Sequence, residues 1–183
     1  MADFRTIAQR TLNEVTESLA RTDPRQFPDF LEALTKRRSV LLTGEGYCAG
    51  VVRVFAHGLS RLGIDARVVG ESTTPGVKLG DLLVVVTEGG DSGVMAQRVT
   101  GARGQGASVA VVTGEARSRL LTEAQMIILL PGPTRTPFSS QTTTDGQSLV
   151  FAEAAMLYLD AVVKALAEQI SRRDIRDVGL SLD

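Results

Sequence analysis

Short apolar runs alternate with helix-like patterns along most of this chain, and this alternation limits the fold more than any other feature. The first run, Val40-Leu41-Leu42, is continuous and apolar, which is typical of a strand buried on both faces of a parallel sheet. Strands are expected over residues 40–42, 66–70, 82–86, 108–112 and 126–130. Because helical patterns and short connections separate them, the sequence predicts an α/β protein, a three-layer α/β/α sandwich around a five-stranded parallel sheet.

Helical periodicity predicts an N-terminal helix pair before the first strand. The expected helices cover residues 3–20, 28–36, 47–62, a segment ending near 104, 116–123 and 148–170. In the third of these, Val54 is expected on the apolar face together with Val51, Phe55 and Leu59, while His57 lies on the opposite side. The 183 residues show no linker or repeat, so one domain is expected: N-terminal helices over 1–37, a core over 38–170 and a C-terminal tail over 171–183.

Composition excludes several classes of protein. The formal net charge is −1, so there is no electrostatic reason to expect a nucleic-acid or membrane partner. The single cysteine, Cys48, excludes an internal disulfide framework and a cysteine-based zinc cluster. Neither a signal-peptide pattern nor a membrane-spanning run is present, and a cytoplasmic protein is therefore expected.

The stretch from Ser39 to Gly50 joins the first strand to a helix through a glycine-rich turn. Gly44 and Gly46 break the strand, and the helical pattern starts almost at once with Tyr47 and Cys48. Such a turn presents free backbone N–H groups and the positive end of a helix dipole, and both favour an anion, above all a phosphate. The helix dipole also lowers the pKa of a thiol at this place, so Cys48 is a candidate reactive group or a stand-in for serine.

Two further polar stretches follow the second and third strands, where open α/β sheets bind ligands. Glu71 begins the first of them, Glu71-Ser72-Thr73-Thr74-Pro75. The second is Thr87-Glu88-Gly89-Gly90-Asp91-Ser92. The candidate donors to a sugar phosphate are the hydroxyls and glycine amides of Ser72, Thr73, Thr74, Thr87, Gly89, Gly90 and Ser92. Thr142, Thr143 and Thr144 precede the last helix and are further candidates.

These stretches resemble the sugar isomerase (SIS) domain proteins, and among them the 6-phospho-3-hexuloisomerase-like branch. The resemblance is carried by Gly44-Glu45-Gly46, by the run from Val68 to Pro75, by Gly80-Asp81-Leu82-Leu83 and by Leu159-Asp160-Ala161-Val162-Val163. It spans nearly the whole chain. It implies a flavodoxin-like five-stranded sheet, a phosphosugar ligand, and a homodimer or homotetramer whose sites are completed between subunits.

The chain also departs from the family pattern. The family's first loop reads Gly-x-Gly-Arg-Ser-Gly, whereas Tyr47, Cys48 and Ala49 fill its last three places here. Glu88 adds a carboxylate to the second loop, which is unfavourable within about 4 to 6 Å of a phosphate unless a cation intervenes. The family's glutamate early in the last helix corresponds to Ala152, with Glu153 one residue later and turned by about 100°. The family's C-terminal Arg-His pair corresponds to Val178-Gly179.

Sugar-phosphate isomerisation needs a base next to a carbonyl, a group that moves a proton between two oxygens, and a phosphate clamp. Glu153 is the candidate base, and Glu71 is an alternative base or a partner for sugar hydroxyls. His57, the only histidine, is either a surface residue or part of a cationic stripe with Arg53 and Arg61 that meets a neighbouring subunit. The expected reaction is aldose–ketose isomerisation of a sugar phosphate, through an enediol and without a metal or cofactor.

Two other functions stay open. A non-catalytic SIS module would bind a phosphosugar as a sensor or partner after losing the base and the Arg-His pair. A dinucleotide-binding domain fits Gly44, Gly46 and Ala49, with Glu71 placed to meet a ribose hydroxyl, but it leaves no second lobe for a substrate and does not explain the loop from Thr87 to Ser92.

Overall fold

The computed structural model describes residues 3–89, 92–132 and 149–179, with side chains in the last helix as far as Ser171. Its centre is one five-stranded sheet with the order β2-β1-β3-β4-β5, in which all neighbouring strands are parallel. The strands are β1 (Val40–Gly44), β2 (Ala66–Val68), β3 (Leu82–Thr87), β4 (Ser108–Thr113) and β5 (Met126–Leu129). This is the flavodoxin-like order, which confirms the expected sheet.

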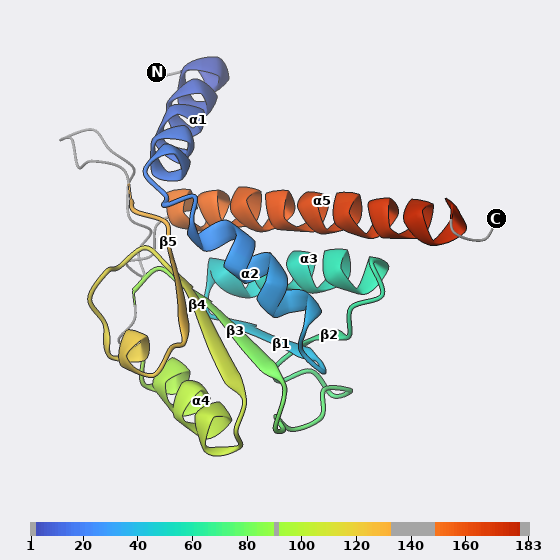
Figure 1. Ribbon diagram of the computed structural model, residues 1–183. Helices are drawn as coiled ribbons and strands as arrows, with labels where there is room; N and C mark the ends of the chain where they lie inside the picture. Colours follow the sequence, from blue (N-terminus) through green and yellow to red (C-terminus); the bar gives the residue numbers. More distant parts are fainter. Residues whose placement is uncertain (1–2, 90–91, 133–148, 180–183) are drawn as a thin grey trace.

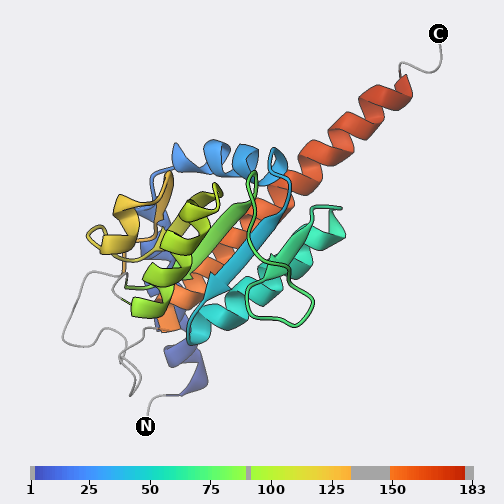
Figure 2. The same cartoon turned by 90° about the horizontal axis from the view of Figure 1, so that it is seen from below.

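Helices cover both faces of the sheet, as Figures 1 and 2 show. One face packs against α2 (Gln26–Thr35), α3 (Tyr47–Arg61) and α5 (Leu149–Gly179) through a core that includes Phe30, Leu42, Phe55 and Leu159. The other face packs against α4 (Gly93–Gly104) and the short 3₁₀ helix η1 (Arg119–Thr122) through Leu41, Leu83 and Met95. All six residues of β3 are buried, as expected for a central strand covered on both sides. The three-layer sandwich is therefore confirmed.

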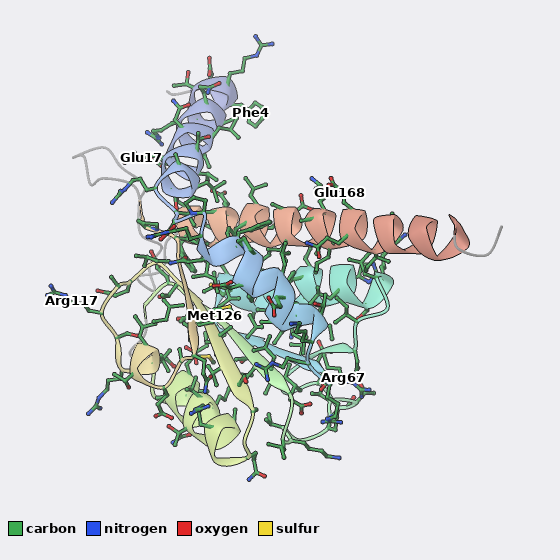
Figure 3. The ribbon with its side chains drawn as sticks, in the orientation of Figure 1. Phe4, Glu17, Arg67, Arg117, Met126 and Glu168 are labelled. Atoms are coloured by element: carbon green, nitrogen blue, oxygen red, sulfur yellow. The ribbon has the colours of Figure 1, made fainter. Side chains whose placement is uncertain are left out.

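Helix α1 (Phe4–Ala20) projects away from this body (Figure 1). Its N-terminus is capped by Asp3, whose carboxylate accepts a hydrogen bond from the Thr6 backbone N–H at 2.8 Å. Val15 packs with Val150 and Ala154 near the start of α5. Phe4 is 82% exposed and points away from the body at the far end of α1 (Figure 3). The helix thus makes a small apolar contact with α5 and leaves apolar side chains open.

Three expectations for helices were wrong in detail. Helix α5 extends to Gly179 instead of ending at Ile170, because no glycine or proline interrupts it before that point. Only a 3₁₀ turn forms within residues 116–123. Val54 is 55% exposed rather than buried, because the buried face of α3 is formed by Val51, Val52 and Phe55 instead. None of the helices in the described part of the chain combines the length and the apolar character needed to cross a membrane.

Candidate functional site

The turn after β1 has a shape that only glycine permits at two positions. Gly46 precedes α3 with a φ of 53°, in the region that favours glycine. At position 44 an added Cβ atom would lie 2.8 Å from the carbonyl oxygen of Cys48, which is closer than real Cβ contacts. The backbone of the first turn of α3 therefore packs directly on the end of β1. Tyr47, the first residue of α3, is 42% exposed.

The loop after β3 is held by its own hydroxyl and carbonyl groups. The Thr87 hydroxyl donates to the Gly89 carbonyl oxygen at 2.6 Å, and Ser92 Oγ accepts from the Met95 backbone N–H at 3.4 Å as the N-cap of α4. The Glu88 carbonyl oxygen accepts from the Gly114 N–H at 3.2 Å and from the Thr113 hydroxyl at 3.2 Å. Gly90 lies outside the described residues, as do Thr142, Thr143 and Thr144.

The two loops meet at Cys48 and Glu88. Cys48 is only 5% exposed, and burial, followed by the charge of Glu88, raises the pKa of its thiol to about 11. The expectation that the helix dipole lowers this pKa was wrong, because burial outweighs the dipole here. Cys48 is thus a small packing residue between the loops. We call this region, residues 44–48 with 87–89 and Ser92, the loop site.

A second group of expected site residues lines a polar cavity of about 300 Å³ beside β2, called the edge cavity here. His57 on α3 lines it together with Glu71, Thr73 and Thr74 from the segment after β2. Arg53 lies between the two regions: its Nε donates to Glu71 Oε1 at 3.3 Å and its Nη1 to the Ala49 carbonyl oxygen at 3.0 Å. The edge cavity is also lined by Arg67, which lies at the β2 edge of the molecule (Figure 3). Ser72 is exposed and does not line the cavity.

Glu153 lies in a third region, a groove of about 560 Å³ lined by residues of α1, α3 and α5 and called the helix groove here. His57 lines this groove as well as the edge cavity. The Oε2 atom of Glu153 is buried and has no hydrogen-bond partner in the described part of the structure. Burial, and then the charge of Glu14, raise the pKa of this carboxyl group above its ordinary value of 4.5.

Ala152 occupies the position of the family's glutamate, and the carboxylate of this chain lies one residue later, at Glu153. Ala152 belongs to the core cluster that contains Cys48 and Val86, whereas Glu153 lines the helix groove. The side chain at position 152 therefore faces the sheet and the side chain at position 153 does not. The structure brings His57 and Glu71 together, and His57 and Glu153 together, in two cavities that share the histidine.

One cation near the loop site was missed from the sequence. Arg98 on α4 donates from Nη1 to the Thr43 hydroxyl, next to Gly44. A signal was present, because Arg98 falls between Met95 and Val99 on the buried side of α4. No group of three His, Cys, Asp or Glu side chains converges among the residues described.

Relatives of this chain at low sequence identity include proteins named 3-hexulose-6-phosphate isomerase. No family model matches the chain. The 3-hexulose-6-phosphate isomerase of Mycobacterium gastri is 26% identical over 154 residues, which are 84% of this chain and 77% of that enzyme. The relatives found give no support to a dinucleotide-binding domain.

Solved structures show the same fold at low identity. A Methanococcus jannaschii protein, for which the function of 3-hexulose-6-phosphate isomerase was inferred, aligns with a TM-score of 0.75 at 19% identity, covering 90% of this chain and 91% of that one. The Vibrio vulnificus NanR protein complexed with ManNAc-6P aligns with a TM-score of 0.74 at 18% identity, covering 100% and 71%. By sequence and by fold, this chain is similar to the sugar isomerase (SIS) domain proteins and, among them, to the 6-phospho-3-hexuloisomerase-like branch.

Proposed function

We propose that this chain is a sugar-phosphate isomerase that takes a 3-hexulose 6-phosphate, with the phosphate at the loop site and the sugar reaching the edge cavity. The loop site joins two glycine- and hydroxyl-containing loops at the carboxyl ends of β1 and β3, which are neighbours in the sheet. In a sheet of order 2-1-3-4-5 this is the switch point at which ligands bind. The M. gastri relative supports the same substrate class.

The observation that carries the proposal is the convergence of His57, Glu71, Thr73 and Thr74 on one cavity. A carboxylate and an imidazole in one cavity match the needs of isomerisation, since one group removes a proton from carbon and the other moves a proton between oxygens. The volume of about 300 Å³ is at the lower end of the range for small-ligand pockets. Arg53 contacts both Glu71 and Ala49, so this cavity adjoins the first turn of α3.

In the reaction that we propose, these groups act in turn. Glu71 removes the proton from carbon 2 of the 3-hexulose, and the electron pair forms a C2–C3 enediolate. His57 moves a proton between the oxygens on these two carbons. Return of a proton to carbon 3 gives a 2-hexulose 6-phosphate. Glu153 is the rival base, because it also shares a cavity with His57.

Turnover of a 3-hexulose 6-phosphate by single variants tests this assignment. Glu71→Gln is expected to lower kcat by about 10²- to 10⁴-fold, as for loss of a general base, with the phosphosugar still bound. Glu32→Gln is the control, because Glu32 is exposed and pairs with Lys36 on α2. A loss confined to Glu153→Gln would transfer the role of base to the helix groove. Failure of the unchanged protein to convert the sugar would contradict the isomerase.

The position of Ala152 favours a second candidate, a phosphosugar-binding module without catalysis. The side chain at 152 faces the core, and no carboxylate is present there. Such a module would bind the hexulose phosphate with an affinity unaffected by Glu71→Gln or Glu153→Gln and would not convert it. Binding without turnover is therefore the result that selects the second candidate.

We infer in addition that two copies of the chain associate through α1 and the helix groove. Leu12 on α1, Val54 on α3, and Met156 and Leu157 on α5 line the groove and are exposed. Helix α1 projects from the body (Figure 1), and its apolar side chains help to line the groove. Two copies related by a twofold axis can therefore each cover the other's groove. Sedimentation velocity should show a dimer that Met156→Glu dissociates, whereas Leu79→Glu, at an exposed leucine in the β2–β3 connection, should not. A monomer in the unchanged protein would contradict this association.

A further inference from the structure

Arg98 differs from every other arginine and lysine whose side chain the structure describes. These side chains are exposed, with the exception of Arg67 and Arg98. Arg67 pairs with Asp65 at 2.8 Å. Arg98 has no acidic partner among the described residues, and its Nη1 donates to the Thr43 hydroxyl. A partly buried charge without a counter-ion is unfavourable, so an anionic ligand would compensate it.

The surroundings of Arg98 connect it to both halves of the loop site. Thr43 is 1% exposed and immediately precedes Gly44. Its hydroxyl also contacts Met95 Sδ at 3.9 Å, and the backbone N–H of Met95 donates to Ser92 Oγ. The guanidinium therefore lies on the α4 side of the sheet, at the carboxyl end of β1, near the start of the first loop and, through Met95, the end of the second.

We propose that Arg98 forms part of an anion subsite on the α4 side of the loop site and binds the phosphate group of the ligand. The identification of that anion as a sugar phosphate rests on the proposed function. Arg98 supplies a cation that the first loop lacks, since Tyr47 stands where the family pattern has arginine. The planar guanidinium keeps donors free after its bond to Thr43, and such donors match phosphate oxygens in pairs. A cation here also offsets the carboxylate of Glu88 near the phosphate.

Titration calorimetry of the full chain tests the subsite with two probes, a hexulose 6-phosphate and inorganic phosphate. Arg98→Gln is expected to raise Kd for both probes by about ten- to a hundredfold, the effect of losing charge-assisted hydrogen bonds. Arg98→Lys keeps the charge and should recover part of the affinity. Arg103→Gln is the matched control, because Arg103 is exposed, lies on the same helix and has no acidic partner among the described residues; its Kd should equal that of the unchanged protein.

Thermal unfolding separates this role from a purely structural one. Without phosphate, Arg98→Gln should melt at or above the temperature of the unchanged protein, since it removes an uncompensated charge. With phosphate, the variant should lose the stabilisation that the unchanged protein gains. Equal lowering of Tm with and without phosphate would overturn the subsite.

The outcomes also distinguish the subsite from the proposed enzyme. Unchanged affinity in Arg98→Gln overturns the subsite and leaves the isomerase standing if the hexulose phosphate is converted. Arg98-dependent binding of both probes without any conversion supports the subsite and contradicts the isomerase. Failure of the unchanged protein to bind either probe overturns the subsite.

Discussion

The strands β1 and β3 lie side by side. A buried charge at their amino ends has a partner of opposite charge, whereas a partly buried charge at their carboxyl ends has none among the described residues. At the amino ends, Asp81 is fully buried and accepts hydrogen bonds from the Ser39 hydroxyl at 2.8 Å and the Lys78 N–H at 2.8 Å. Arg38 forms an ion pair with it at 2.7 Å. At the carboxyl ends, Arg98 reaches Thr43 without an acidic partner among the described residues, beside two loops that can present N–H and hydroxyl groups.

The charged groups at the amino end stabilise the fold, whereas the carboxyl end is where we propose that the ligand binds. At the amino end the buried carboxylate of Asp81 is paired within the chain with Arg38, the Ser39 hydroxyl and the Lys78 N–H. At the carboxyl end hydrogen-bonding capacity remains after the fold is complete, and a phosphate can use it. The motif Gly80-Asp81, which contributed to the family resemblance, therefore maintains the fold, while the glycine loops on the same strands carry the proposed chemistry.

Asp81→Ala is expected to have the largest effect and to act on stability alone. It removes the acceptor shared by Arg38, Ser39 and the Lys78 N–H, and loss of a buried charged partner costs about 3 kcal/mol of unfolding free energy. The folded fraction should bind phosphate with unchanged affinity. Urea unfolding and calorimetry measure the two quantities. Asp65→Asn, in an exposed pair with Arg67, is the control and should cost less than about 1 kcal/mol. A loss of phosphate affinity in Asp81→Ala would contradict the claim that the amino ends of the strands affect stability and not binding.

Gly44→Ala should disturb the carboxyl end. The added methyl group would meet the Cys48 carbonyl oxygen at 2.8 Å, and forcing the backbone apart should cost about 1 to 3 kcal/mol. Phosphosugar affinity should fall as well, because the loop moves. Gly50→Ala in α3 is the matched control: its Cβ would meet nothing within 4 Å, and it should stabilise the helix by about 0.5 to 1 kcal/mol. Full binding by a stable Gly44→Ala protein would exclude the first loop from the site.

Glu153→Gln should have a smaller effect that depends on pH. The folded state raises the pKa of Glu153, mainly through burial, so the unfolded state loses this proton first. Stability contributed by the group is therefore lost as pH rises above 4.5. Glutamine removes that dependence, so the variant should have a higher Tm than the unchanged protein at pH 7 and a similar one at pH 4. The opposite pH trend would contradict the burial of Glu153 in the helix groove.

The last prediction concerns the rate at which the Cys48 thiol reacts with a disulfide reagent. It involves no change in stability, but it tests directly whether the loop site encloses Cys48. Because burial raises the thiol pKa to about 11, little thiolate forms at pH 8 and the folded protein should react slowly with a disulfide reagent. The same reagent should react quickly in denaturant. A phosphosugar that closes the loops should slow the native reaction further. Equal rates with and without denaturant would mean that the two loops do not enclose Cys48.

Most of the sheet could be predicted because β1, β3, β4 and β5 each contain an unbroken apolar run, as in Val40-Leu41-Leu42. Runs of this length between helical patterns are typical of buried strands. The end of α5 could not, since apolar periodicity stops near Ile170 while helix-compatible residues continue to Gly179. The exposure of Val54 could not be predicted either. Periodicity gives the apolar face of α3, but the packing of α1, α3 and α5 decides whether a side chain on that face is covered.

Individual residues of the candidate site could be predicted from the sequence, but the contacts between residues distant in sequence could not. The glycines of the first loop were found because they break the apolar run. The structure explains them, since Gly46 has a φ of 53° and Gly44 lies against the Cys48 carbonyl. Cys48 is buried in a core cluster that includes Ala152, and the charge of Glu88 adds to the effect of burial on its pKa; both residues are distant in sequence, so local reasoning gave its pKa the wrong direction. Arg98 was missed because its place between Met95 and Val99 indicates only the buried side of α4. Its contact with Thr43 depends on how α4 packs against β1, which the spacing within one helix does not give.

Backbone amide NMR during titration with a hexulose 6-phosphate tests the contrast between the two strand ends most directly. We expect shift changes at residues 43–48, 71–74, 87–89 and 92–98, with residues 78–82 at the amino ends unchanged. Changes confined to residues of the helix groove, or no changes at saturating ligand, would contradict a phosphosugar site at the carboxyl ends of β1 and β3.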